Sequence, residues 1–344
     1  MKTSSTFQKK LSSLLNSENE TSGTTNLFLS NPFKKKTKLD ALPHWNKWIG
    51  LMSELDWLWM RLRDDHSRTI LLHTVLYHLK GNQGLLRWRG ENLRWLPPVP
   101  EKPNEEYIRI SFMDWILQRR SLHSIGLPIT LFLPNRRPSA VIDLEQYADP
   151  RHRFFVRESD IVIDGGGCWG DSALYFAYLA GINGEVYSFE FLPENLKVMR
   201  RNLEMNPELM GRVRIIEKPL WSEVGKEMEF ICDGPATRIG KKVEDSAEIL
   251  KVESTTIDAL YDSGVFKKVD FIKLDIEGAE LEALHGAKNV ISKFRPLMAL
   301  CVYHCPEHFT QLARFVDQIH PDYYFSLDHM HDGPWETVLY ASPR

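Results

Sequence analysis

Short apolar runs and longer amphipathic stretches alternate along the second half of the chain. The apolar runs, rich in Val, Ile and Phe, cover residues 161–163, 185–190, 212–217, 269–275 and 297–304. Between them, apolar residues recur at the spacing of helices, most clearly at 193–205 and 307–319. This alternation predicts an α/β fold whose parallel sheet is covered by helices on both faces.

The end of the chain departs from this alternation. Two strand-like runs, 323–328 and 336–341, are joined through Asp332-Gly333 without a helix between them, which predicts an antiparallel hairpin. Five parallel strands and a terminal hairpin form the Rossmann-like sheet of class I methyltransferases. Residues 225–232 read as an added strand, and the polar segment 233–253 as a loop near the site.

The first half of the chain has a different pattern. Residues 1–40 contain few apolar residues and are expected to form a disordered or loosely docked tail. Helical spacing predicts a helix over 45–62 and a second over 69–80, with Ser67 as its N-cap and Gly81 after its end. We therefore divide the chain into the tail 1–40, a mostly helical N-terminal region 41–155 and an α/β domain 156–344.

Composition excludes some classes of protein. The 344 residues carry a net charge of −3, which gives no general attraction to nucleic acid or anionic membranes. No apolar run is long enough to span a bilayer, and residues 1–10 lack a signal core. Four cysteines in a chain of this length do not make a disulfide framework, so we expect a cytoplasmic protein.

A glycine-rich loop follows the first predicted strand. Gly165, Gly167 and Gly170 fit the dinucleotide spacing G-x-G-x-x-G, with Glu190 at about the distance that the ribose requires. The loop equally suits S-adenosylmethionine (SAM), and Asp164 favours this reading because a carboxylate at the strand end suits a cationic sulfonium. Asp171 or Ser172 would cap the helix that follows, and free N–H groups there suit a polar ligand.

Charged and polar residues stand at the predicted carboxyl ends of the strands, where α/β sheets bind ligands. They are Asp164, Glu190, Asp275 and His304. Glu190 is placed to accept hydrogen bonds from both ribose hydroxyls. Glu277 follows Asp275 closely, and a helix-capping role would explain this pair of acids almost as well as a functional one.

Five motifs follow one another along the second half of the chain: residues 160–177, Phe189-Glu190 with Pro193 and Asn195, residues 273–280, residues 284–287 and residues 336–340. Together, in this order, they resemble the FkbM family of SAM-dependent methyltransferases. The similarity covers roughly residues 145–344. It implies a class I methyltransferase fold, SAM as cofactor, and O-methylation of sugars, polysaccharides or polyketide-type products. The cofactor-binding residues expected on this basis are Asp164, Gly165, Gly166, Gly167, Gly170, Asp171, Ser172, Glu190, Phe191, Asn195, Trp221 and Asp275.

Methyl transfer to an alcohol requires alignment of the reacting atoms and a base that removes the hydroxyl proton. His304 is the first candidate for this base, because the pKa of histidine lies near neutrality and residues 299–304 resemble a family subgroup. His329, Glu277 and Asp275 are the other candidates. Mg²⁺ bound by Asp275 and Glu277 stays open, whereas zinc is not expected, since Cys301 and His304 alternate to opposite faces of a strand.

The sequence thus predicts a SAM-dependent O-methyltransferase acting on a hydroxyl of a glycan or natural-product acceptor. The N-terminal region would contribute to acceptor binding or to homo-oligomerisation. Seven of the ten tryptophans lie between Trp45 and Trp115, mostly at core spacing, although exposed ones could stack on sugar rings. An NAD-dependent oxidoreductase and a non-catalytic SAM-binding assembly module are the alternatives. A nucleic-acid methyltransferase is disfavoured, because no Asn/Asp-Pro-Pro-Tyr motif or basic aromatic stripe is present.

Overall fold

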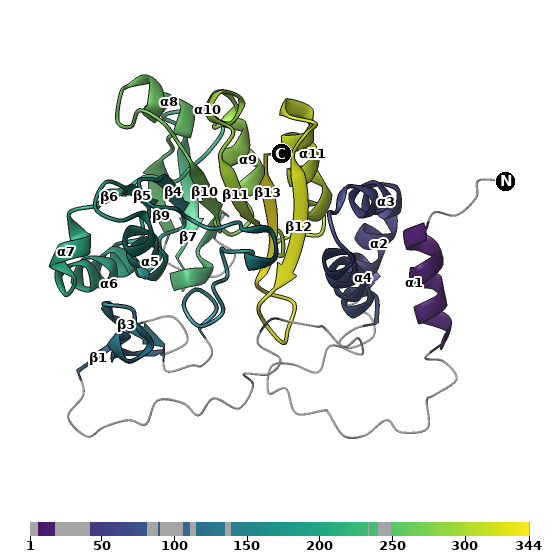
Figure 1. The fold of residues 1–344 in the computed structure, drawn as a ribbon, viewed down its shortest axis with the longest axis horizontal. Helices are drawn as coiled ribbons and strands as arrows, with labels where there is room; N and C mark the ends of the chain where they lie inside the picture. Colours follow the sequence, from purple (N-terminus) through teal and green to yellow (C-terminus); the bar gives the residue numbers. More distant parts are fainter. Residues whose placement is uncertain are drawn as a thin grey trace.

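The computed structural model describes residues 6–17, 42–80, 89, 106–110, 115–134, 139–232, 234–239 and 249–343. Most of the predicted tail, Gly81 and much of the polar segment 233–253 lie outside these residues. Within the described part, a central mostly parallel sheet lies between layers of helices, and helices α1–α4 lie beside one edge of it (Figure 1).

The central sheet has seven strands in the order β12-β13-β11-β10-β4-β5-β6. Their bounds are β4 Ile161–Gly165, β5 Glu185–Phe189, β6 Val213–Ile216, β10 Phe271–Leu274, β11 Leu297–Cys301, β12 Tyr324–His329 and β13 Thr337–Ser342. Strands β6, β5, β4, β10 and β11 pair in parallel, and β13 pairs antiparallel with both β11 and β12. The predicted class I methyltransferase sheet with its terminal hairpin is therefore confirmed.

The register of the parallel strands brings their carboxyl ends to one edge. Lys273 in β10 lies opposite Asp164 in β4, and Gly165 lies opposite both Leu274 and Phe189. The loops that leave β4, β5 and β10 consequently meet in one place. Ligands of open α/β sheets bind at this edge.

Helices cover both faces of the sheet. Successive residues of β4 point to opposite faces, so that Val162 packs with helices α5 and α6 while Ile163 packs with the helices on the other face. The helices of the α/β domain are α5 Asp171–Ala180, α6 Pro193–Glu204, α7 Pro207–Met210, α8 Ile257–Asp262, α9 Glu280–His285, α10 Lys288–Phe294 and α11 His308–Ile319. This double burial explains why the strands have continuous apolar runs.

The N-terminal helices cover the β12 edge of the sheet. They are α1 Thr6–Ser17, α2 Leu42–Gly50, α3 Met52–Arg61 and α4 Asp65–Lys80. The backbone N–H of Arg63 donates to the Phe325 carbonyl, and the Ser67 hydroxyl accepts from the backbone N–H of Leu327. An edge strand has unpaired backbone groups, and these contacts satisfy some of them.

Three details of this region differ from the sequence expectation. Residues 6–17 form α1, whose Phe7 is fully buried, so this part of the expected tail is docked. The single helix over 45–62 is two helices, α2 and α3. Ser67 does not cap α4; instead, its backbone N–H donates to the Asp64 carboxylate, because α4 begins four residues earlier than expected, at Asp65.

Two of the tryptophans in these helices are buried in the core, and a third packs against a charged side chain. Trp48 and Trp59 are buried, at 1% and 5% exposure, as their helical spacing suggests. Trp57 is half-buried and lies 3.6 Å from the Arg314 guanidinium, measured to the ring centroid. These three side chains therefore serve the packing of the helices rather than a sugar surface.

Residues 106–134 contribute a sheet that the sequence pattern left unassigned. Strands β1 Tyr107–Arg109, β2 Ile116–Ser121 and β3 Thr130–Pro134 are antiparallel. Asn202 on α6 accepts a hydrogen bond from the Phe132 backbone N–H and donates to its carbonyl, so this side chain acts as a strand partner for β3. The N-terminal region thus contains strands as well as helices.

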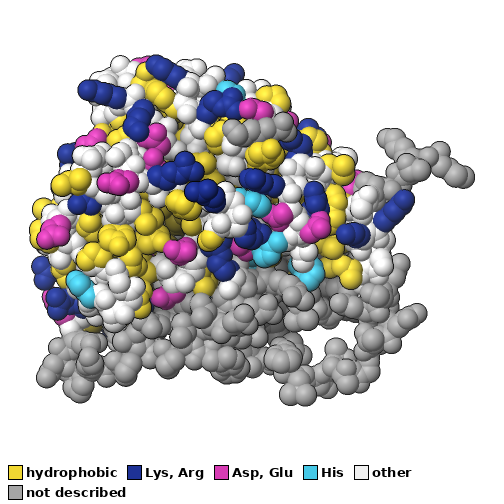
Figure 2. Space-filling view, in the orientation of Figure 1, with side chains coloured by type: hydrophobic (Ala, Val, Ile, Leu, Met, Phe, Trp, Pro, Cys, Tyr) yellow, Lys and Arg dark blue, Asp and Glu magenta, His cyan; other side chains and the backbone are white. Residues whose placement is uncertain are grey.

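A second small sheet lies beside the carboxyl ends of the central strands. Its strands are β7 Glu227–Ile231, β8 Arg238–Ile239 and β9 Ile249–Glu253, in the order β8-β7-β9. The added strand expected over 225–232 is therefore present as β7. On the face shown in Figure 2, basic and acidic side chains are interspersed over the described residues. Within that part of the chain, no helix is long and apolar enough to cross a membrane.

Candidate functional site

The glycine-rich loop after β4 is shaped by the protein's own backbone. Gly166 has a φ of 85°, and a Cβ there would lie 1.9 Å from the Asp275 carbonyl oxygen. A Cβ on Gly167 would lie 2.2 Å from the Ser188 hydroxyl oxygen. The loop therefore passes so close to the ends of β5 and β10 that these two positions must be glycine. Gly170, rather than Asp171 or Ser172, is the N-cap of α5.

Asp164 lies beneath this loop and is enclosed by the protein. Its carboxylate is fully buried, pairs with the Lys273 ammonium at 3.2 Å and accepts hydrogen bonds from the hydroxyls of Ser172 and Ser188. The expectation that Asp164 faces a sulfonium is therefore wrong. Lys273 already neutralises the Asp164 carboxylate, and Asp164 lines neither of the two cavities at this edge of the sheet.

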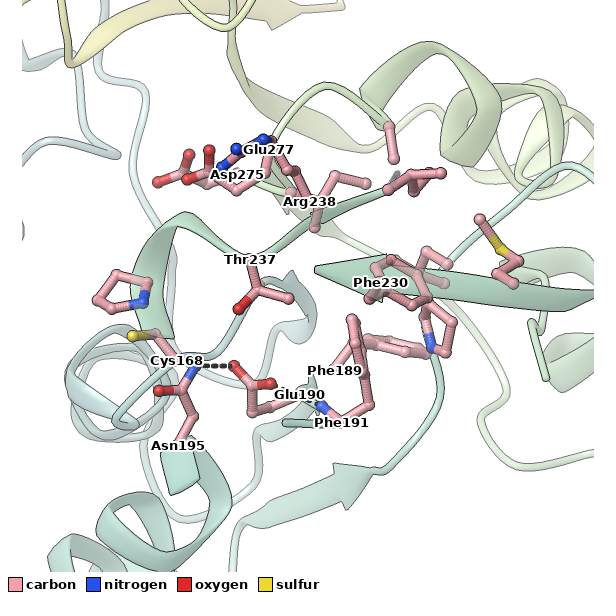
Figure 3. A pocket seen from close by; sticks show the side chains of 18 of the residues that line it. Cys168, Phe189, Glu190, Phe191, Asn195, Phe230, Thr237, Arg238, Asp275 and Glu277 are labelled. Atoms are coloured by element: carbon pink, nitrogen blue, oxygen red, sulfur yellow. Dashed lines mark hydrogen bonds between the residues drawn. The ribbon is translucent and has the colours of Figure 1, made fainter. Parts of the chain in front are cut away.

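The first of these cavities, here called the narrow cavity, lies between the ends of β4, β5 and β10 and the small sheet. It holds 660 Å³ of space free of protein atoms. Figure 3 shows the side chains that line it. Its lining includes Gly166, Cys168, Phe189, Glu190, Phe191, Asn195, Leu220, Trp221, Phe230, Arg238, Asp275, Ile276 and Glu277.

Glu190 is fixed at the end of β5. One carboxylate oxygen, Oε1, accepts the backbone N–H groups of Phe191 and Leu192, each at 2.7 Å, and Oε2 accepts the Asn195 side-chain amide at 3.1 Å. Burial raises the pKa of Glu190, and these three donors oppose that rise. Because Oε2 has one partner, it retains acceptor capacity for a ligand hydroxyl on the cavity side.

Two other polar atoms in the wall of the narrow cavity are buried without a partner among the described residues. They are the Asn195 side-chain oxygen and the Trp221 indole nitrogen. Buried polar atoms usually have a hydrogen-bond partner, so a ligand with donors and acceptors would complete this wall. Across the cavity, the rings of Phe191 and Phe230 lie 4.4 Å apart and form an apolar surface. Polar acceptors beside apolar rings fit the ribose and adenine of a nucleoside cofactor such as SAM.

The second cavity, here called the wide cavity, holds 1590 Å³ of space free of protein atoms. Its lining combines aromatic, acidic and basic side chains, including Trp115, Arg120, Gln146, Tyr147, Trp169, Asp171, Ser172, Lys273, Asp275, Glu277, Tyr303, Met330, His331, Asp332 and Glu336. Both cavities are lined by Gly166, Cys168, Pro235, Asp275 and Glu277. These five residues therefore form a common wall between the two cavities.

Asp275 is the most constrained acid in the common wall. Its carboxylate accepts hydrogen bonds from the hydroxyl of Tyr147 at 2.9 Å and from that of Tyr303 at 2.8 Å. The His304 ring nitrogen Nε2 lies 3.5 Å from the same carboxylate. A carboxylate that accepts two hydrogen bonds and also faces this ring nitrogen is held in one orientation.

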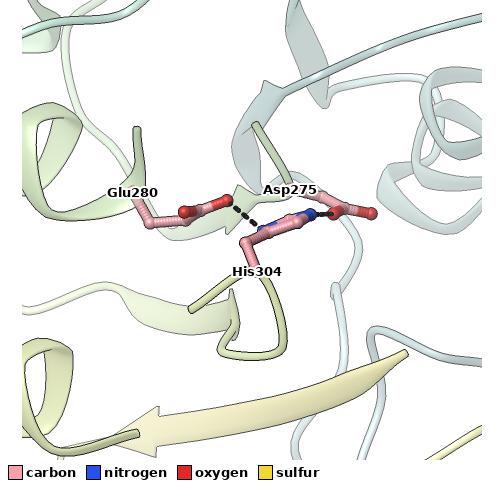
Figure 4. Close-up of side chains that lie close together, drawn as sticks. All are labelled: Asp275, Glu280 and His304. Atoms are coloured by element: carbon pink, nitrogen blue, oxygen red, sulfur yellow. Dashed lines mark ion pairs between the residues drawn. The ribbon is translucent and has the colours of Figure 1, made fainter. Parts of the chain in front are cut away.

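His304 lies within a group of carboxylates (Figure 4). Its Nδ1 is 2.8 Å from the fully buried Glu280, and its Nε2 is 3.5 Å from both Asp275 and Glu277. His308 pairs with the other Glu280 oxygen at 3.1 Å. Burial opposes the charged form of both histidines. The adjacent acids outweigh it at His304 and raise its pKa well above its usual value, while Cys305 together with Glu280 raises the pKa of His308 to about 9.

This charge state changes the roles expected from the sequence. An imidazolium has no lone pair with which to accept a proton, so the geometry does not favour His304 as the base. The same cation also lies between Asp275 and Glu277, where it supplies the countercharge that Mg²⁺ would otherwise provide. The three-residue group Asp275, Glu280 and His304 is close enough to hold a metal, but its members already compensate one another.

Glu277 is the least constrained acid of the common wall. Its side chain is 31% exposed, and among the described residues it pairs with His304, at 3.5 Å. Its backbone has a φ of 54°, and Cys168 and Glu336, which also line the wide cavity, have φ values of 44° and 63°. Non-glycine residues in this region are strained, and such strain concentrates at functional sites.

Glu336 follows the hairpin turn and faces the wide cavity. Burial, together with the charges of Asp275 and Glu277, raises the pKa of Glu336 to about 8. The Gln146 side-chain amide donates to it at 2.5 Å. At neutral pH this carboxyl group is therefore protonated and can donate a hydrogen bond into the cavity.

The site residues predicted from the sequence fall into three groups: some line the narrow cavity, some line only the wide cavity, and some line neither. Gly166, Glu190, Phe191, Asn195, Trp221 and Asp275 line the narrow cavity, whereas Asp171 and Ser172 line only the wide one. Asp164 and three glycines of the loop, Gly165, Gly167 and Gly170, line neither. His329 is also apart: its fully buried ring contacts the Thr337 hydroxyl, and burial lowers its pKa to about 4. Tyr147 and Trp169 were missed, because no local pattern marks them.

Comparison with known proteins identifies the domain that carries the narrow cavity and part of the wide one. Residues 163–330 match the family model described as the methyltransferase FkbM domain. The chain contains an FkbM methyltransferase domain. The resemblance to the FkbM family of SAM-dependent methyltransferases is thus confirmed. None of the curated proteins matches the sequence.

Solved structures resemble the chain in fold. The crystal structure of methyltransferase FkbM from Methylobacillus flagellatus KT has a TM-score of 0.56 and 18% identity, covering 86% of this chain. This chain spans 60% of that protein's length. Fibrillarin from Aeropyrum pernix, crystallised with SAM, has a TM-score of 0.38 and 11% identity over 71% of this chain and 85% of its own. A SAM-dependent methyltransferase from Aquifex aeolicus has a TM-score of 0.34 and 14% identity over 59% and 92%.

Proposed function

We propose that the protein is a SAM-dependent O-methyltransferase that methylates a hydroxyl of a sugar or a similar polyhydroxylated acceptor. The observation that carries the proposal is the common wall between the two cavities. The narrow cavity has the chemistry of a nucleoside site and the wide cavity has room for an acceptor. Methyl transfer requires that cofactor and acceptor meet in one place, and Asp275 and Glu277 lie at that place.

The chain's residues suit SAM in the narrow cavity. Glu190 and Asn195 would accept the ribose hydroxyls, and Phe191 and Phe230 would contact the adenine. Bound there, SAM would supply a methyl group on a positively charged sulfur. The carboxylates of the common wall favour such a cation electrostatically, which is the role that the sequence assigned to Asp164.

The wide cavity suits a polyhydroxylated ring. Trp115 and Trp169 lie 6.2 Å apart between ring centroids and form an aromatic wall. The indole nitrogen of Trp169 is buried without a partner in the described chain. Aromatic faces contact the apolar C–H groups of a sugar, and acids accept from its hydroxyls. Since residues between 115 and 147 supply much of the lining of the wide cavity, we propose that the N-terminal region takes part in acceptor binding.

We assign the base to Glu277. Its carboxylate lines both cavities and, among the described residues, has His304 as its one ion-pair partner, so it can accept the acceptor's hydroxyl proton as the new C–O bond forms. Asp275, oriented by Tyr147 and Tyr303, would hold the hydroxyl toward the narrow cavity. His304 and Glu280 act through these groups: they fix the loop after β10 and are positioning residues.

Two other functions compete with this proposal. An NAD-dependent oxidoreductase would need a site for a pyrophosphate, whereas the common wall contains two carboxylates. A non-catalytic SAM-binding module would not need a strained, partly exposed Glu277 facing a second cavity. Measurements of ligand binding and of methyl-transfer turnover distinguish both alternatives from the proposal.

Isothermal titration with SAM, S-adenosylhomocysteine, NAD and NADP tests the cofactor. We expect the two adenosyl ligands to bind and Glu190→Gln to weaken both at least about tenfold, since it removes a charge-assisted acceptor. Glu208→Gln, an exposed glutamate on α7, is the matched control and should bind like the unaltered protein. Binding of NAD in place of SAM would overturn the proposal.

A further inference from the structure

The turn between β12 and β13 forms part of the rim of the wide cavity. Met330, His331, Asp332 and Glu336 line this cavity, and Trp335 lies among them in the sequence. Trp335 is 54% exposed, although most of the described tryptophans are buried or half-buried. A large aromatic side chain is therefore presented to solvent directly beside the proposed acceptor site.

The exposed indole is held in place by its own turn. A Cβ on Gly333 would lie 3.1 and 3.2 Å from two carbon atoms of the Trp335 ring, so the ring is seated on the backbone of this glycine. The His331 ring contacts it edge-on, with centroids 5.3 Å apart and planes at 79°. The backbone N–H of Gly333 donates to His331 Nδ1 at 2.9 Å, which fixes the two rings together.

The surroundings of Trp335 are polar rather than apolar. His331 and Asp332 precede it, with Gly333 and Pro334 between, and Glu336 follows it, so that among the described residues of this turn hydrogen-bonding groups flank the indole on both sides in the sequence. A membrane or an apolar protein partner would be expected to meet a continuous apolar patch. A sugar ring has an apolar C–H face and a hydroxyl edge, and therefore matches this arrangement.

We propose that Trp335 is an outer sugar-binding subsite, on which the ring next to the methylated unit stacks. The acceptor is then a saccharide chain rather than a single sugar. His331 and Gly333 preorganise the platform, so that little ordering is required when the second ring binds. This inference rests on the proposed function, because it assumes that the first ring occupies the wide cavity.

Saturation-transfer NMR on the full chain with bound S-adenosylhomocysteine tests the proposal. The probes are maltotriose, mannotriose and N,N′,N″-triacetylchitotriose, each compared with its own monosaccharide. We expect at least one trisaccharide to bind about tenfold more tightly than its monosaccharide, which is a usual contribution of one stacked ring. Trp335→Ala should remove this advantage without changing monosaccharide binding, and Trp335→Phe should keep most of it.

Ile182→Ala is the control variant, because Ile182 is 78% exposed and lies just before β5, which three strands of the central sheet separate from β13. A trisaccharide that binds no more tightly than its monosaccharide, or an advantage that survives Trp335→Ala, overturns the subsite alone. If no sugar binds while S-adenosylhomocysteine does, the sugar acceptor itself is wrong and the subsite falls with it.

Discussion

Two aspartates at the ends of neighbouring strands have opposite roles in this protein. Asp164 ends the apolar run of β4, and Asp275 follows β10, the strand that pairs with it. Asp164 is fully buried, and its cluster consists of Lys273, Ser172 and Ser188. Asp275 lines both cavities, and its cluster consists of Tyr147, Tyr303, His304 and Glu277.

The difference arises from where each side chain stands relative to the end of its strand. Asp164 is still within β4, so its side chain points into the layer between sheet and helix α5, where Ser172 and Lys273 meet it. Asp275 lies one residue beyond β10, where the chain turns and its side chain enters the cavities. The same residue type is thus structural inside the strand and available for chemistry just outside it.

The largest expected effect is on turnover and belongs to the Asp275 cluster. Glu277→Gln keeps the size of the side chain and removes its ability to accept a proton, so kcat should fall by about 10²–10⁴-fold. Affinity for S-adenosylhomocysteine and the midpoint of urea unfolding should stay unchanged. The initial rate of methyl transfer to a bound saccharide measures the effect, with Glu208→Gln as the control. Unchanged turnover would exclude Glu277 as the base.

The next effect is on stability and belongs to the Asp164 cluster. Asp164→Asn leaves Lys273 charged and buried without its counter-ion, which should lower the free energy of unfolding by about 3–5 kcal/mol. Urea unfolding followed by circular dichroism measures this change. The exposed Asp262, substituted in the same way, should change stability by less than about 0.5 kcal/mol. Equal effects of the two substitutions would contradict the structural role of Asp164.

The smallest expected effect is a pH dependence at the rim of the Asp275 cluster. The folded protein holds a proton on Glu336 up to about pH 8, whereas the unfolded chain releases it near pH 4.5. The native state then binds more protons between these values, so stability falls as the pH rises from 4.5 to 8. Glu336→Gln should remove this slope and be more stable at pH 8 by at least about 1 kcal/mol. Thermal unfolding at several pH values measures it, and parallel curves for both proteins would exclude the buried carboxylic acid.

Much of the fold follows from local patterns. The strands of the central sheet and the two longest helices of the α/β domain were located within a few residues, because burial on both faces requires uninterrupted apolar runs and helices repeat at 3.6 residues. The strands over 107–134 were not assigned, since they are short and pair with one another or with the side chain of Asn202. Such partners are not visible in the local sequence.

The sequence by itself determined the succession of strands and helices, the glycine loop and the acids that follow the strands, because each depends on residues close together in the chain. The tertiary structure alone decided which acids do chemistry. Tyr147 reaches Asp275 across 128 positions of sequence, and Glu280 converts His304 from a candidate base into a cation. Charge state and cavity access are properties of neighbours in space, and the linear order of residues does not contain them.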